Sequence, residues 1–101
     1  MKPYKWEKQP WEKRKLEFDF TLSLATGDSV ASVSGATMWS GTTDVSSEMI
    51  SGDPSISSNK VYVTVYGGTD GTTYNLRLRV VTTNGDQIED DLDVVVAQKG
   101  Q

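Results

Sequence analysis

The chain has 101 residues with 10 basic and 14 acidic side chains, and therefore a formal net charge of −4 at neutral pH. This length corresponds to one domain with a modest core, and the hydrophobic residues (36%) gather in alternating runs, which argues against global disorder. There is no cysteine and no histidine, so disulfides, thiolate sites and the commonest acid–base side chain are excluded.

Charge is unevenly distributed along the chain. Residues 1–20 carry six basic and four acidic side chains, whereas residues 21–101 carry four and ten. A nucleic-acid-binding domain needs a concentrated basic face, so we expect no nucleic-acid partner. No run approaches the roughly 18 apolar residues of a membrane span. The charged N-terminus also lacks the apolar stretch of a signal peptide, and we expect neither feature.

The first 14 residues are predicted to form an N-terminal arm. A Trp-Glu-Lys tripeptide at 6–8 recurs at 11–13, a spacing that keeps to one face of neither a strand nor a helix, and two prolines disfavour a continuous element. In one interpretation Trp6 and Trp11 anchor the arm on a partner protein. In the other, which we favour because large aromatic side chains are usually buried, one or both rings cover the open end or the edge of the sandwich.

Strict alternation of apolar and polar residues from Leu16 to Leu24 predicts a strand with one face in a core, ending at the turn residues 25–28. The following segment is rich in serine, threonine and glycine, with an apolar residue every few positions, a pattern typical of short sandwich strands. We place these strands near 29–34, 36–40, 44–50 and 55–58, with loops at Gly35, Gly41 and residues 52–54.

The pattern is clearest from Lys60 onward. It predicts a strand at 61–66, a second at 74–80 and a last one at 88–96, with Arg77 and Arg79 across from acids of the last strand. The glycines of the first connection are expected to form a tight corner with positive φ; they are Gly67, Gly68 and Gly71. The second connection contains Asn84 and Gly85, which predict a two-residue type I′ hairpin turn.

About seven short strands with no substantial helix predict an all-β fold. We expect an antiparallel β-sandwich of the immunoglobulin or fibronectin type III kind at residues 15–98. Tyr74 starts the penultimate strand directly after a glycine-containing corner, where a tyrosine corner has its tyrosine. Its expected role is therefore structural.

The sequence contains no convincing catalytic pattern. The glycine loop at 67–71 is followed by neither a lysine nor a helix, unlike a phosphate loop, and no histidine is present to activate a serine. An acidic cluster near the C-terminus could hold calcium, but its spacing matches no calcium loop and a strand divides such acids between two faces. Its members are Asp86, Glu89, Asp90, Asp91 and Asp93. We expect no enzyme activity, no cofactor and no metal, with calcium as a minor alternative.

Three segments carry a family resemblance: Gly-Asp-Ser-Val-Ala-Ser at 27–32, Gly-Gly-Thr-Asp-Gly-Thr-Thr-Tyr at 67–74 and Val-Val-Thr-Thr-Asn-Gly-Asp at 80–86. With them the chain resembles small immunoglobulin-like phage proteins described as fiber-tail adaptor or virion structural proteins. The resemblance implies a non-catalytic phage or prophage tail protein, made in the bacterial cytoplasm and located in the virion. Its partners would be other tail proteins or further copies of itself, and no catalytic residue is carried over.

A second class of function stays open. Trp39, Tyr62 and Tyr66 could form an aromatic platform on a bacterial surface or carbohydrate-binding adhesion module. The same side chains could equally belong to the core or to an unspecialised surface.

Overall fold

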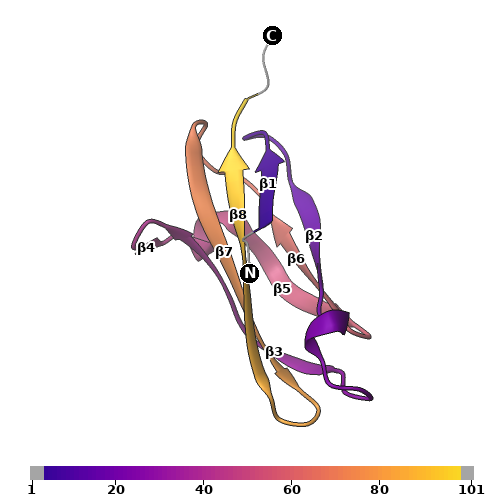
Figure 1. The fold of residues 1–101 in the computed structure, drawn as a ribbon. Helices are drawn as coiled ribbons and strands as arrows, with labels where there is room; N and C mark the ends of the chain where they lie inside the picture. Colours follow the sequence, from indigo (N-terminus) through magenta and orange to yellow (C-terminus); the bar gives the residue numbers. More distant parts are fainter. Residues whose placement is uncertain (1–3, 99–101) are drawn as a thin grey trace.

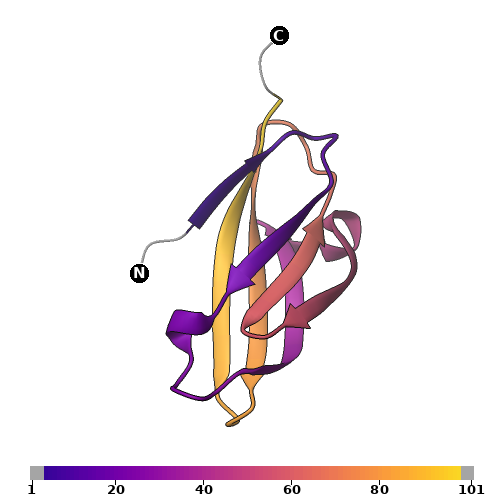
Figure 2. The same ribbon diagram turned by 90° about the vertical axis from the view of Figure 1, so that its right-hand side faces the viewer.

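The computed structural model describes residues 4–98, which form eight strands and two short helices. The strands build a five-stranded sheet in the order β1-β8-β7-β3-β4 and a three-stranded sheet in the order β2-β6-β5 (Figures 1 and 2). The bounds are β1 Tyr4–Lys8, β2 Arg14–Asp19, η1 Thr21–Ser23, β3 Val30–Ser40, β4 Thr43–Asp44, α1 Ser46–Met49, β5 Ile50–Ser57, β6 Lys60–Val65, β7 Thr72–Thr82 and β8 Gln87–Val96. The predicted all-β sandwich is confirmed, and neither helix is long enough to cross a membrane.

The core lies between the two sheets and is built by alternating side chains. The inward-facing residues of β6 and β7 are Val61, Val63, Val65, Tyr74, Leu76, Leu78 and Val80, all buried. Each fully buried Val or Leu contributes about 1.5–3 kcal/mol. Because a slip of one residue would turn this whole set to solvent, the core also fixes the strand register.

Strand β1 joins the five-stranded sheet, although residues 1–14 were expected to form a separate arm. It pairs in parallel with β8, from Tyr4 opposite Leu92 to Lys8 opposite Val96. Trp6 packs half-buried against the core, and Lys8, two residues on, is buried. The sequence did not predict this strand because the charged residue Lys8 occupies a core-facing position. Residues 1–3 of the predicted arm lie outside the described residues.

Strand β2 ends at Asp19, so the prediction that the strand continues to Leu24 is wrong. The Asp19 carboxylate accepts hydrogen bonds from the N–H (3.0 Å) and the hydroxyl (2.6 Å) of Thr21, which lower its pKa and turn the chain into η1. Phe20 still reaches the core, but Leu22 is 100% exposed. A local hydrogen bond between a side chain and the backbone therefore competes with the strand here, despite the alternating pattern.

The middle of the chain also differs from the prediction. Residues 30–40 form one long strand, and Gly35 lies within it at a register irregularity rather than in a loop. The strand expected at 44–50 is replaced by β4 and α1, and the carboxylate of Asp44 accepts the backbone N–H of Ser46 at 2.9 Å where the chain enters α1. Strand β5 then runs through the loop expected at 52–54, where its pairing with β6 is irregular.

The β7–β8 hairpin has a three-residue loop instead of the predicted type I′ turn. Thr82 and Asp86 close the loop, Gly85 donates to the carbonyl of Thr82 at 2.9 Å, and Gly85 has a φ of 93° whereas Asn84 does not have a positive φ. This is a type I turn followed by a left-handed glycine. Buried Asp28 stabilises it by accepting the N–H of Asn84 at 3.1 Å.

The hairpin predicts an acid-sensitive stability. Burial raises the pKa of Asp28, but the nearby Thr82 hydroxyl and the hydrogen bonds from the backbone N–H groups of Ser29 and Asn84 outweigh this effect and hold the pKa below the ordinary value. The stabilisation by this carboxylate is therefore complete above the unfolded pKa of about 3.9 and is lost as the pH falls through the lower folded pKa. Asp28→Asn should reduce stability at pH 7 and flatten that acid decline in urea titrations. Asp53→Asn, at an exposed position, is the control, and an unchanged acid decline in Asp28→Asn would contradict the assignment.

Candidate protein-contact site

One end of the elongated sandwich, which measures 48 × 22 × 22 Å, collects three segments distant in sequence (Figure 2). They are the β1–β2 turn, the β6–β7 loop and the residues that follow β8. Ala97 donates its N–H to the carbonyl of Lys8 at 2.9 Å, and Gln98 donates its own to the carboxylate of Asp70 at 2.9 Å. The three segments thus form one connected surface.

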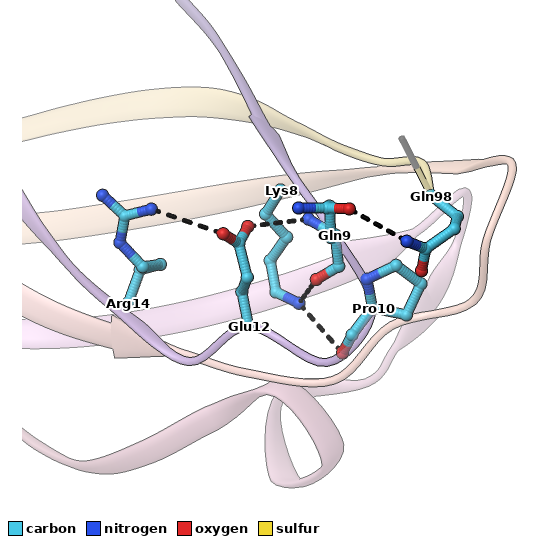
Figure 3. Close-up of polar contacts among 6 residues, drawn as sticks. All are labelled: Lys8, Gln9, Pro10, Glu12, Arg14 and Gln98. Carbon is cyan, nitrogen blue, oxygen red and sulfur yellow. Dashed lines mark hydrogen bonds and ion pairs between the residues drawn. The ribbon is translucent and has the colours of Figure 1, made fainter. Parts of the chain in front are cut away.

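The side chain of Lys8 lies at the centre of this end and is 2% exposed. Its ammonium donates to the carbonyls of Gln9 (2.7 Å), Pro10 (3.3 Å) and Gly67 (2.6 Å), and Figure 3 shows the first two contacts. Burial lowers the pKa of Lys8, while the negative charge of Glu12 partly opposes that effect. A single buried cation therefore joins the β1–β2 turn to the β6–β7 loop.

Further hydrogen bonds fix the shape of the β1–β2 turn. Gln9 donates its backbone N–H to the carboxylate of Glu12 at 2.9 Å, and Glu12 donates its own to the carbonyl of Gln9 at 3.0 Å. The other carboxylate oxygen of Glu12 lies 3.7 Å from the guanidinium of Arg14 (Figure 3). The amide of Gln98 donates to that of Gln9 at 2.9 Å, which ties the turn to the C-terminal side of β8.

This braced turn carries Trp11, whose exposed fraction is 93%. The two tryptophans of the sequence repeat therefore have different environments, because Trp6 packs against the core. Exposing a large aromatic ring forfeits the apolar burial that an indole usually obtains. Trp and Arg dominate the binding energy of protein interfaces, so an exposed Trp on an ordered turn is suited to contact a protein.

The glycine corner supports the turn from the other side. Gly67, Gly68 and Gly71 all have positive φ, and a Cβ on Gly68 would lie 2.7 Å from a methyl carbon of Val96. The hydroxyl of buried Tyr74 accepts the N–H of Thr69 at 2.9 Å, closing the loop across five residues. The corner thereby places the carbonyl of Gly67 beside the Lys8 ammonium.

The three aromatic side chains considered as a carbohydrate platform do not lie together. Trp39 pairs with Asn75 on the outer face of the five-stranded sheet, because its neighbour Met38 points into the core. Tyr62 lies between buried Val61 and Val63 and so points outward from the three-stranded sheet. Tyr66 donates its hydroxyl to the carbonyl of Ser47 at 3.2 Å.

The acidic residues of β8 are divided between two faces. Glu89, Asp91 and Asp93 oppose Arg79, Arg77 and Asn75 on the outer face. Asp90 opposes buried Leu78 on the inner face, and burial raises its pKa. Within residues 4–98 no group of three or more acidic side chains is placed to hold a metal ion.

Sequence reasoning did not find Lys8, although it singled out the repeat that contains it. Lys8 and Lys13 end identical tripeptides, yet Lys8 is buried and Lys13 is exposed. The available signal was the position of Lys8 two residues after Trp6, which puts both side chains on the same face once residues 4–8 are a strand.

The comparison with protein families decides the relationship of the chain. The family model described as podophage GP4 fiber-tail adaptor protein gp77 matches residues 8–96. The chain belongs to this family. Among curated proteins none matches the chain. The span matched by the fiber-tail adaptor family begins at Lys8 and ends with β8, so it includes the β1–β2 turn with Trp11.

The Lys8 contacts predict a difference between the two lysines of the repeat. Lys8→Met keeps much of the side-chain volume but removes every donor, so the free energy of unfolding should fall by about 1–3 kcal/mol. Lys13→Met, the matched change at an exposed position, should stay within about 0.5 kcal/mol of the original protein. Urea denaturation measures both, and equal effects of the two changes would contradict a special role of Lys8.

The corner predicts a second stability difference. Gly68→Ala introduces both a positive φ for alanine and a clash with Val96, and should cost about 2–4 kcal/mol. Gly71→Ala has the same backbone requirement but nothing within 4 Å of its Cβ, and should cost about 1 kcal/mol. Thermal unfolding distinguishes the two. A Gly68→Ala variant as stable as Gly71→Ala would show that the close approach is relieved without cost.

Proposed function

We propose that this chain is a non-catalytic structural protein of a phage tail, located in the virion, which acts through contacts with other tail proteins. Membership of the fiber-tail adaptor family supports the tail assignment. The contact of the β1–β2 turn with a partner is carried by one observation, the exposure of Trp11 on a turn that Lys8 holds in place.

The β1–β2 turn that carries Trp11 is ordered before any partner binds. Ordering a loop or a long side chain on association weakens binding, and a contact residue already fixed avoids this cost. The bonds between Gln9 and Glu12, together with the Lys8 ammonium, order the turn in the free protein. The indole therefore enters an apolar pocket of the partner with most of its burial energy retained.

Trp11→Ala should weaken binding to tail structures by at least about 30-fold, because an interface tryptophan of this kind contributes about 2 kcal/mol or more. Its melting temperature should not change, since the ring is almost fully exposed. Surface plasmon resonance of the purified chain on tails assembled without it measures the affinity, and calorimetry measures the melting temperature.

Leu22→Ala is the matched control, since Leu22 is equally exposed and lies beyond the far end of β2. The proposal requires that Leu22→Ala bind normally and that Lys8→Met bind more weakly than the original protein while Trp11 is intact. Normal tail binding by Trp11→Ala would refute a contact through the β1–β2 turn. Absence of the chain from purified particles that contain the other tail proteins, measured by mass spectrometry, would refute the virion role itself.

A further inference from the structure

The outer face of the five-stranded sheet carries an arginine that is held in place before any partner binds. Asn75 donates its amide to the carboxylate of Asp93 at 3.2 Å and accepts the Nε–H of Arg77 at 2.9 Å. The guanidinium then lies over the ring of Trp39, 5.4 Å from its centroid. The indole N–H of Trp39 is fixed in turn by the hydroxyl of Thr37 at 2.9 Å.

This arrangement orients Arg77 without neutralising it. Asn75 stands between the acids of β8 and the guanidinium, and no carboxylate within residues 4–98 forms an ion pair with Arg77. Arg77 lines a hollow of about 170 Å³. The hollow is lined by Ser34, Gly35, Thr37, Trp39, Arg77 and Arg79. A planar guanidinium fixed in this way is suited to bidentate recognition of a carboxylate.

The adjacent edge of the sheet is unpaired along most of β3, and β5, which includes Asp53, borders it across a shallow hollow. Strand β3 bonds β7 on one side, but on the other side it pairs with β4 only at Trp39 and Ser40. Residues 31–37 read Ala-Ser-Val-Ser-Gly-Ala-Thr, with no charge and no proline to block another strand. The edge strand β2 of the other sheet, in contrast, carries Lys15, Glu17 and Asp19.

We propose that this face binds an acidic, extended segment of a partner tail protein. A carboxylate side chain of the segment enters the hollow against Arg77 and Arg79, and its backbone lies along residues 31–37 of β3. Recognition of this kind obtains affinity from the strand edge and specificity from the side-chain pocket. The inference rests on the proposed role in the tail.

Charge complementarity selects the occupant. Residues 21–98 contain ten acidic side chains and only three basic ones, and two of those three, Arg77 and Arg79, line this hollow. Glu89, Asp91 and Asp93 of β8 lie on the same outer face, so an acidic segment is repelled on the β8 side and attracted only at the hollow between β3 and β7. Arg79 also lies 3.3 Å from Glu89 in an exposed ion pair, which leaves Arg77 as the principal anchor.

The test uses the whole chain and a capped peptide of alternating glutamate and threonine, with a glutamine–threonine peptide as its uncharged match. In NMR titrations of the isotopically labelled protein, the acidic peptide should shift the amide signals of residues 31–39 and the indole signal of Trp39. The glutamine peptide should bind at least about tenfold more weakly, because it lacks the charge-assisted hydrogen bonds. Shifts confined to the basic residues 13–15, or no shifts, would overturn the proposal.

Variants and a small anion distinguish binding at Arg77 from binding near Arg14 and from a site for small anions. Arg77→Gln should weaken binding of the acidic peptide about tenfold, whereas Arg14→Gln, which removes an exposed arginine at the other site, should leave it unchanged. Equal binding by Arg77→Gln would overturn the assignment. Free glutarate that binds as tightly as the peptide would show a site for small anions and contradict a role of the strand edge. Trp11→Ala should bind the peptide normally, so failure of this proposal and failure of the Trp11 contact are distinguishable.

Discussion

The buried ammonium of Lys8 is the interaction on which the arrangement of one end of the sandwich depends. Removing a cation from water is unfavourable, and three backbone carbonyls from two separate loops offset that loss. Without the ammonium, the carbonyls of Pro10 and Gly67 would lose this donor, whereas the carbonyl of Gln9 would keep the N–H of Glu12. The contact therefore holds strand β1, the β1–β2 turn and the glycine corner in a single arrangement, and it explains why the N-terminal segment is part of the fold.

Order at this end has a consequence for function, because the same bonds that fix the turn leave Trp11 with nothing to pack against. Trp6, in contrast, lies in β1 and packs against the core. On the outer face, Asn75 and Trp39 orient the guanidinium of Arg77, and neither of them carries a charge that would form an ion pair with it. Intramolecular bonds order the backbone of the turn that carries Trp11, and at Arg77 they orient the side chain itself.

The sequence predicted the strands from Lys60 onward because nothing local competes with their alternation, and the burial of Val61, Leu76 and Val94 follows it directly. The strand predictions at 16–24 and 44–50 were wrong where a short polar side chain accepts a hydrogen bond from a nearby backbone N–H. The carboxylates of Asp19 and Asp44 each bond a residue two positions ahead, ending β2 and starting α1. Lys8 was beyond prediction for another reason, since its carbonyl partner on Gly67 is 59 residues away and charge normally marks an exposed position.

The two proposed contacts differ in their physical character. An indole in an apolar pocket is held by burial, which salt does not weaken, whereas a guanidinium–carboxylate contact at an exposed face is screened as salt rises. Strand β8 connects the two places rigidly, pairing with β1 through Val96 and with Asn75 through Asp93. Salt therefore weakens the proposed Arg77 contact more than the proposed Trp11 contact.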